Sequence, residues 1–386
     1  MVRPAPDAAG CTRRYRPPVG ISRALGLAAL VAALGAPAAH AATSTTWCGT
    51  GAAAADQLPD SISAFQIHVI LAYPSDGVDR LAELATPIAS DIETISNWWI
   101  GQDPTREPRF DLFPFPGCAS PAGDLDLSSV RLPHDSAYYL GEVERYERIL
   151  SDLDSLGFSD PDKKYLVYFG GPVEQPTTLC GQSGTDLADT GGPRAYSIVY
   201  LAGQCALGLG EGGVATVVAV HELIHGLGAL PSPGPPNACP GGAGHPCDSP
   251  TDILYPSQSS SVALGQLVLD YGRDDYYGHR GSWYDVRNSL FLAHLDAPGE
   301  IAPVGPAAVR AKKTGGAVRL SWPAATGSVA YRLYRNGALV ATTHGLSARF
   351  AGLPGQTLLL GVRAQGEDGL LGPRLTVRVK LTRTAS

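Results

Sequence analysis

The sequence of 386 residues predicts two domains of different fold class, an α/β domain followed by an all-β sandwich. Two observations carry this prediction. Strand-like and helical patterns alternate up to about residue 230, which is typical of a layered α/β domain. From about residue 304 only strand-like patterns with turn signals occur, which is typical of a β-sandwich. Residues 296–306 are rich in Pro and Gly and read as the linker between the two.

The first domain is expected to open with a buried strand over residues 65–73 that ends at Pro74. Apolar residues at helical spacing predict amphipathic helices over residues 76–100 and 138–156. Two strand-like runs follow at residues 165–169 and 195–201, and then an apolar helix at residues 214–230. The irregular stretch over residues 230–261 is long for a compact domain, so it needs either a tether or a function.

The C-terminal region, residues 301–386, has the pattern of a small sandwich. Strand-like runs occur at residues 317–322, 331–334, 348–350, 357–364 and 375–379, and Asn336-Gly337 is a hairpin signal. The region resembles a fibronectin type III domain, with Trp322 as the buried core tryptophan, residues 331–337 as the central hairpin and Leu353-Pro354-Gly355 as a turn. The resemblance implies an accessory or spacer role without catalytic residues.

The N-terminus has the pattern of a secretory signal over residues 1–41. Five arginines precede or enter an apolar run at residues 24–34, and Ala39-His40-Ala41 fits a cleavage site. The run is shorter than the roughly 20 residues that span a bilayer, and no later stretch is long enough. We therefore expect a secreted, extracellular protein with no membrane span after signal removal.

Cysteine usage is consistent with export. Six cysteines remain after the signal, and an even number in an exported chain indicates three disulfides. We expect neighbours in sequence to pair, most clearly Cys239 with Cys247, which flank a short loop rich in Gly and Pro. Cys48 has an alternative role, because a free cysteine near the mature N-terminus can also cap a zinc ion and keep the site that holds the ion latent.

His221-Glu222-Leu223-Ile224-His225 is the motif that carries chemistry. Residues i and i+4 lie on one face of a helix, so His221 and His225 can bind one Zn²⁺ ion. Glu222 is then placed to act as the general base toward a zinc-bound water. The alternative is an ordinary helix with two solvent-facing histidines, but the apolar residues 214–220 predict a buried helix, where such a polar pair needs a purpose.

With Gly228, the motif resembles the metzincin signature, His-Glu-x-x-His-x-x-Gly. The resemblance implies a metzincin-like zinc peptidase domain over residues 42–300. It departs at Pro231, where the long form of the signature has the third histidine ligand. A residue farther along must replace it: we predict His245, with Asp248 as the main alternative and His279 as a more distant one. Residues 251–256 resemble the family's Met-turn, with Leu254 in place of methionine.

The sequence therefore predicts a secreted zinc metalloendopeptidase whose partners are protein or peptide substrates. The formal net charge of −7 offers no basic patch for nucleic acid. The alternative function is a zinc-binding but inactive extracellular binding or adhesion protein. Peptide preference and oligomeric state do not follow from the sequence.

Overall fold

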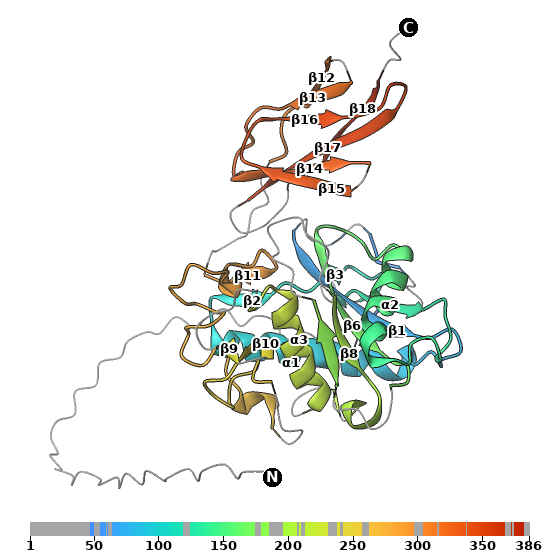
Figure 1. Cartoon of the computed structure of the whole chain (residues 1–386), viewed down its shortest axis with the longest axis vertical. Coiled ribbons are helices and arrows are strands. Elements are labelled where there is room, and N and C mark those ends of the chain that lie inside the picture. Colours follow the sequence, from blue (N-terminus) through green and yellow to red (C-terminus); the bar gives the residue numbers. More distant parts are fainter. Residues whose placement is uncertain are drawn as a thin grey trace, which may run out of the picture. The chain divides into compact units, whose positions relative to one another are not determined.

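A computed structural model gives the fold of most of the chain (Figure 1). The described residues are 47–49, 55–58, 60, 64–118, 124–173, 179–184, 196–206, 208–209, 213–230, 238–239, 242–256, 262–296, 304–314, 316–336, 338–366, 372 and 374–381. The predicted signal segment and the predicted domain boundary at residue 300 lie outside them. No helix within these residues is long and apolar enough to cross a membrane.

A five-stranded sheet forms the centre of the first domain, in the order β5-β1-β6-β8-β7. Four strands run parallel, and β7 pairs antiparallel with β8 at one edge. The strands span β1 Gln66–Tyr73, β5 Leu127–Arg131, β6 Lys163–Phe169, β7 Gly181–Ser183 and β8 Tyr196–Tyr200. The three strands predicted from sequence are β1, β6 and β8, while β5 and β7 are too short to give a pattern.

Helices cover both faces of this sheet. Helices α1 (Leu81–Gln102) and α3 (Val214–Gly226) pack on one face, where Val69, Leu166 and Val199 point. Helix α2 (Glu142–Ser155) packs on the other face, against residues such as Ile70 and Ile198. Because side chains alternate along a strand, each strand contributes to both cores, and its sequence reads as continuously apolar. The arrangement is the α/β layering that the sequence predicts.

The helices are shorter than the periodicity predicts, for local reasons. Helix α1 begins at Leu81 because Gly77 closes a turn with Pro74 and the Asp79 carboxylate accepts the Leu81 amide hydrogen. Helix α2 begins after Gly141, whose φ of 103° is not helical. Helix α3 ends at Gly226 and not at residue 230. An apolar pattern continues past these boundaries because flanking residues are also buried.

Irregular chain surrounds the sheet and is held by disulfides. The bonds are Cys48–Cys118, Cys180–Cys205 and Cys239–Cys247, which are the expected sequence neighbours. The bond to Cys118 occupies Cys48, so Cys48 is not the free thiol that the latency alternative requires. The short elements are β2 Arg106–Pro108, β3 Leu112–Phe113, β4 Asp124–Leu125, β9 Ala238–Cys239, β10 Gly242–Pro246, β11 Leu292–His294, η1 Gly203–Ala206, η2 Leu264–Gln266 and η3 Val286–Asn288.

The C-terminal region is a sandwich of two antiparallel sheets around a separate core (Figure 1). One sheet has the order β12-β13-β16 and the other β15-β14-β17-β18. The strands are β12 Arg310–Thr314, β13 Ala317–Ser321, β14 Ala330–Arg335, β15 Ala338–Thr343, β16 Ser347–Ala351, β17 Thr357–Gln365 and β18 Leu375–Lys380. Trp322 is buried in this core, as expected. Strand β12 has no apolar alternation and was not predicted.

Asp162 links the sandwich to the first domain. Its carboxylate accepts hydrogen bonds from Tyr334 (2.9 Å), from Arg363 (2.8 Å) and from Arg332, three side chains on the outer face of β14 and β17. Arg332 also donates to the Pro161 carbonyl at 3.0 Å. Asp162 is 4% exposed and Arg332 2% exposed, so these charges are shielded from water. Because a buried charge is costly when its partner is removed, this contact should contribute to stability.

We predict that Asp162→Ala lowers the free energy of unfolding of the full-length chain by about 3 kcal/mol, because it leaves the Arg332 guanidinium buried without its carboxylate. Denaturant unfolding followed by circular dichroism measures this change. Glu147→Ala, at an exposed position of α2, is the matched control and should change stability by less than about 0.5 kcal/mol. Equal midpoints for the two variants would show that the Asp162 contact does not stabilise the chain.

Candidate metal centre

Helix α3 carries the motif and is held in place by buried polar contacts. The Asp91 carboxylate on α1 accepts hydrogen bonds from Thr216 on α3 and from the Tyr168 hydroxyl on β6, the latter at 2.5 Å. Farther along α3, the Ser197 hydroxyl on β8 donates to the Glu222 carbonyl at 2.8 Å. These contacts fix both the position and the rotation of the helix against the sheet. The histidine face of α3 therefore has one orientation.

The end of α3 explains the glycine of the motif. Gly228 has a φ of 106°, which only glycine adopts without strain. Its amide donates to the His225 carbonyl at 2.8 Å, and the Ala229 amide donates to the Ile224 carbonyl at 3.2 Å. This pair of bonds is a Schellman motif, which stops the helix directly after the second histidine. The chain then leaves the helix toward the irregular segment that contains His245.

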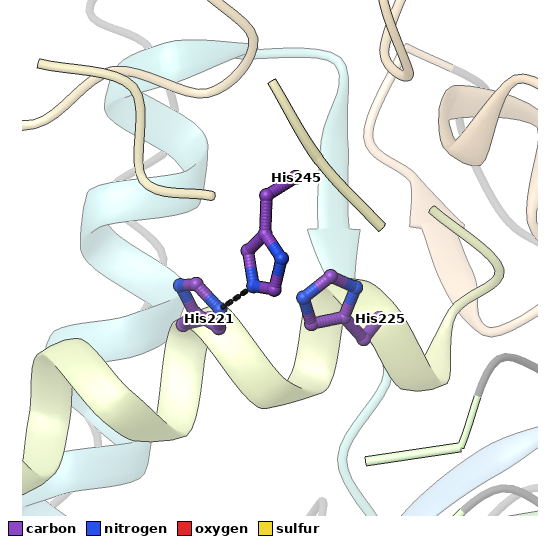
Figure 2. Close-up of side chains that lie close together, drawn as sticks. All are labelled: His221, His225 and His245. Atoms are coloured by element: carbon purple, nitrogen blue, oxygen red, sulfur yellow. Dashed lines mark hydrogen bonds between the residues drawn. The ribbon is translucent and has the colours of Figure 1, made fainter. Parts of the chain in front are cut away.

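Three imidazoles converge beside the helix, as Figure 2 shows. One ring nitrogen from each of His221, His225 and His245 lies within 4.8 Å of the others. The Nε2 atoms of His221 and His245 are 3.2 Å apart. His221 and His225 come from successive turns of α3, while His245 comes from β10. The structure thus brings together the three residues that the sequence predicts as metal ligands.

A hydrogen bond to the backbone sets the orientation of His221. Its Nδ1 donates to the Ile253 carbonyl at 2.8 Å, which leaves Nε2 without a proton and directed at His245. The Ile253 carbonyl lies in the turn over residues 251–256. Asp252 holds this turn: its carboxylate accepts the Leu254 amide and the Tyr271 amide, each at 2.7 Å. Leu254 itself is fully buried, which suits the apolar floor expected of this turn.

A disulfide encloses the segment that bears His245. Cys239–Cys247 closes the β9–β10 hairpin, and β9 pairs antiparallel with β10. Gly244, next to His245, has a φ of 89°, which favours glycine, whereas a side-chain carbon there would lie in ordinary contact with the His225 ring at 3.5 Å. The position therefore favours glycine for its backbone conformation and not for space. Closing the loop covalently lowers the entropy that is lost when His245 is fixed.

Burial keeps His221 and His225 in the neutral form that binds metals. Burial and the neighbouring His245 lower the pKa of His221 to about 4. Burial, together with His221 and His245, holds the pKa of His225 well below its usual value. Glu222 is 8% exposed, and burial raises its pKa to about 8. A dication held by the histidines would favour the carboxylate and lower that pKa again.

The donor set fits zinc. Zinc prefers neutral imidazole nitrogens at about 2.0–2.1 Å in a tetrahedral shell. Two ligand nitrogens of such a shell lie about 3.3 Å apart, close to the 3.2 Å between Nε2 of His221 and of His245. Three protein ligands leave one position open, which is the arrangement of catalytic zinc sites. Glu222 follows His221 directly on the same helix and does not belong to this group of possible metal ligands.

The alternative third ligands lie elsewhere. Asp248 is exposed and groups with Asp274 and Asp275, not with the histidines. The His279 ring stacks on Trp283 at 4.7 Å, and its Nδ1 accepts the Gly281 amide hydrogen. The geometry therefore favours His245, while its role as a ligand stays a prediction.

Sequence reasoning missed the residues that position this centre. Nothing in the sequence marked Ser197, which holds the helix backbone, or the Ile253 carbonyl, which orients His221. Asp252 lies in the turn motif over residues 251–256. An Asp in a turn often accepts a hydrogen bond from the backbone amide two residues later, so the sequence did carry a signal for this contact. Gly181 on the edge strand was not singled out either, although it lies against Glu222.

A second group of possible metal ligands surrounds the ammonium group of Lys163. Asp56, His68, Asp111 and Asp126 lie together where β1 and β6 begin. The Lys163 ammonium group bonds Asp56 at 2.7 Å, Asp60 at 2.8 Å and Asp111 at 2.5 Å. The cation that these carboxylates attract is therefore part of the chain, and we interpret the group as a buried ion-pair network. Burial, with the nearby Asp111 carboxylate, raises the pKa of Asp126 to about 7.

Comparison with known proteins identifies no family for the chain as a whole. No protein-family model matches it, and no curated protein matches it. The similar solved structures include fibronectin type III domains. They are FN3tt (21% identity, 22% of this chain and 99% of that one, TM-score 0.20), the sixth such domain of human fibronectin type III domain containing protein 3 (20%, 23% and 93%, 0.21) and an Fn3-like protein from Clostridium thermocellum (21%, 22% and 100%, 0.19).

We predict that His245→Ala lowers zinc affinity by at least about 100-fold, because it removes one of three ligands. Asp248→Ala, at an exposed position outside the histidine group, is the matched control and should bind zinc as the wild type does. Competition titration with a chromogenic chelator measures both affinities. The reverse result, loss only in the Asp248 variant, would make Asp248 the third ligand.

We also predict that Asp126 weakens the fold as pH rises. Its folded pKa of about 7 lies above the ordinary value of 3.8 for an unfolded chain, so its stabilising contribution is complete below about pH 4 and is lost as pH rises through 7. Asp126→Asn should match the wild type near pH 4 and exceed its free energy of unfolding at pH 8, by on the order of 2 kcal/mol. Denaturant unfolding at both pH values measures the difference. A difference that is the same at both would contradict the shift.

Proposed function

We propose that this chain is a secreted zinc-dependent endopeptidase with a metzincin-like catalytic domain. The observation that carries the proposal is the convergence of His221, His225 and His245 beside the buried Glu222. Two of these histidines and Glu222 come from one helix that ends in the glycine turn of the signature. The three disulfides are compatible with export, which the signal pattern over residues 1–41 also supports.

Each residue has a definite part in hydrolysis. His221, His225 and His245 would hold the zinc, and His221 is oriented for this by the Ile253 carbonyl. When bound, zinc would supply a Lewis acid that polarises the scissile carbonyl and lowers the pKa of a water molecule. Glu222 would accept a proton from the attacking water and pass it to the leaving amine nitrogen. A carboxylate on a fixed helix suits this task because it needs no rearrangement between the two transfers.

The edge of the sheet supports a peptide as the substrate. Strand β7 is the last strand of the five-stranded sheet, and its Gly181 lies against the Glu222 side chain. An extended peptide can add to a sheet edge through backbone hydrogen bonds, which do not depend on its sequence. A substrate that paired with β7 would pass directly beside the base. Binding along a strand requires several residues on both sides of the scissile bond, which favours cleavage within a chain.

Glu222 also argues against a purely binding role. Burying a carboxylate costs free energy unless it is paired, and no ion pair involves Glu222 among the described residues. A protein that only holds zinc through three histidines gains nothing from this acid. The same site in an inactive binding protein would tolerate its loss.

We predict that Glu222→Gln retains zinc and fold but loses turnover by about 10²- to 10⁴-fold, because the amide cannot accept the proton. Cleavage of casein and of a quenched peptide, with metal content measured on the same samples, tests this. The control variant is Glu147→Gln on α2, which should cleave as the wild type does.

A chelator should abolish the activity and added zinc should restore it. Wild-type protein that binds zinc stoichiometrically but cleaves neither substrate would instead favour the inactive binding protein. Full turnover by Glu222→Gln would contradict the role of Glu222 while leaving the zinc site intact.

A further inference from the structure

Gly181 lies directly against the side chain of Glu222, the base of the proposed mechanism. In the β7–β8 ladder, Gly181 pairs with Val199 and Ser183 with Ser197. Paired residues of two strands point to the same face of a sheet. Val199 packs in the core beneath α3, and Ser197 bonds the Glu222 carbonyl, so this face is the one that α3 covers. A side chain at position 181 would therefore point at α3.

The space for such a side chain is already filled. A carbon atom added to Gly181 would lie 2.6 Å from Cγ of Glu222, 2.7 Å from its Oε1 and 2.6 Å from Cγ1 of Val218. Carbon atoms in van der Waals contact are about 3.5–4.0 Å apart. Gly181 is not among the residues with a positive φ. The position therefore requires glycine for space and not for backbone conformation.

Neither the strand nor the helix can move apart to make room. The Cys180–Cys205 disulfide and the bond from the Tyr200 amide to the Cys180 carbonyl (2.9 Å) hold the start of β7. The Tyr146 hydroxyl accepts the Gly184 amide hydrogen at 2.8 Å just after β7 ends. On the other side, the Ser197 bond holds the helix backbone at Glu222. Val218 is β-branched and keeps one χ1 rotamer in a helix, so the side chain that is free to shift is that of Glu222.

We propose that Gly181 is a positioning residue for the peptidase reaction, because its missing side chain makes the space that holds the Glu222 side chain. Because strand β7 lies against the Glu222 side chain, it limits the rotamers that this side chain can adopt. It thereby fixes the direction in which the carboxylate points. This inference rests on the proposed function, in which Glu222 is the base. It adds that the reaction requires glycine on strand β7, which is far from the histidine motif in sequence.

The test compares Gly181→Ala with the wild type in the full-length, zinc-loaded protein. Zinc content should be unchanged, because no ligand is touched. The kcat should fall by about 100-fold with KM nearly constant, since a displacement of about 1 Å at a reacting group costs this much. Gly170→Ala is the matched control: its added carbon would meet nothing closer than the Ala72 carbonyl oxygen at 3.7 Å. That variant should keep the wild-type kcat.

A stability cycle tests the steric contact without using activity. Gly181→Ala should lower the melting temperature of the otherwise wild-type protein by several degrees. In a Glu222→Ala background the same change should cost less, because one of the two side chains with which it collides is gone and only the contact with Val218 remains. A purely structural role of Gly181 would give the same loss in both backgrounds.

The outcomes separate this inference from the proposed function. A wild-type kcat in Gly181→Ala, or equal losses of melting temperature in the two backgrounds, would overturn the positioning role. Wild-type protein without peptidase activity would overturn the proposed function, and the stability cycle would still decide whether Gly181 makes the space for Glu222. Loss of kcat with intact zinc, together with non-additive melting temperatures, supports the positioning role.

Discussion

The hydrogen bond from His221 to the Ile253 carbonyl is the contact on which the candidate centre depends. It joins the helix that carries two histidines to the irregular segment that carries the third, and it fixes which nitrogen of His221 is available. The geometry of this hydrogen bond depends on how firmly the helix and the turn that it joins are held. Ser197 holds the helix, and Asp252 holds the turn, so a neutral, directed imidazole results from contacts that lie outside the motif itself.

The parts of the fold that the sequence predicts are those with a repeating pattern. Strands β1, β6 and β8 are continuous buried runs, and the helices bury apolar side chains at helical spacing. Both patterns can be recognised without knowing the partners of these elements. Strand β7 could not be found in this way, because three residues contain no period and Gly181 contributes no side chain. The role of Gly181 comes from the side chain of Glu222, which belongs to helix α3 and lies 41 residues later in the chain.

The residues of the candidate site also fall into those that a repeating pattern predicts and those that it does not. His221, Glu222 and His225 follow from helical geometry, since positions four apart share a face. The placement of His245 depends on a hairpin closed by a disulfide, and the choice between His245 and Asp248 could not be made from their spacing. The contacts of Asp162 show a further limit. Arg332 and Tyr334 alternate with core residues as solvent-facing side chains do, yet both are buried against the first domain.

The Cys239–Cys247 disulfide makes the candidate metal centre depend on the redox state of the compartment in which the chain lies. In a reducing compartment the Cys239–Cys247 loop is open, and a chain there has two histidines fixed on a helix and a third on a slack segment. Two fixed imidazoles hold zinc weakly. On the proposed function, with His245 as the third ligand, the centre is completed only after oxidation, and the proposed peptidase would stay inactive until export.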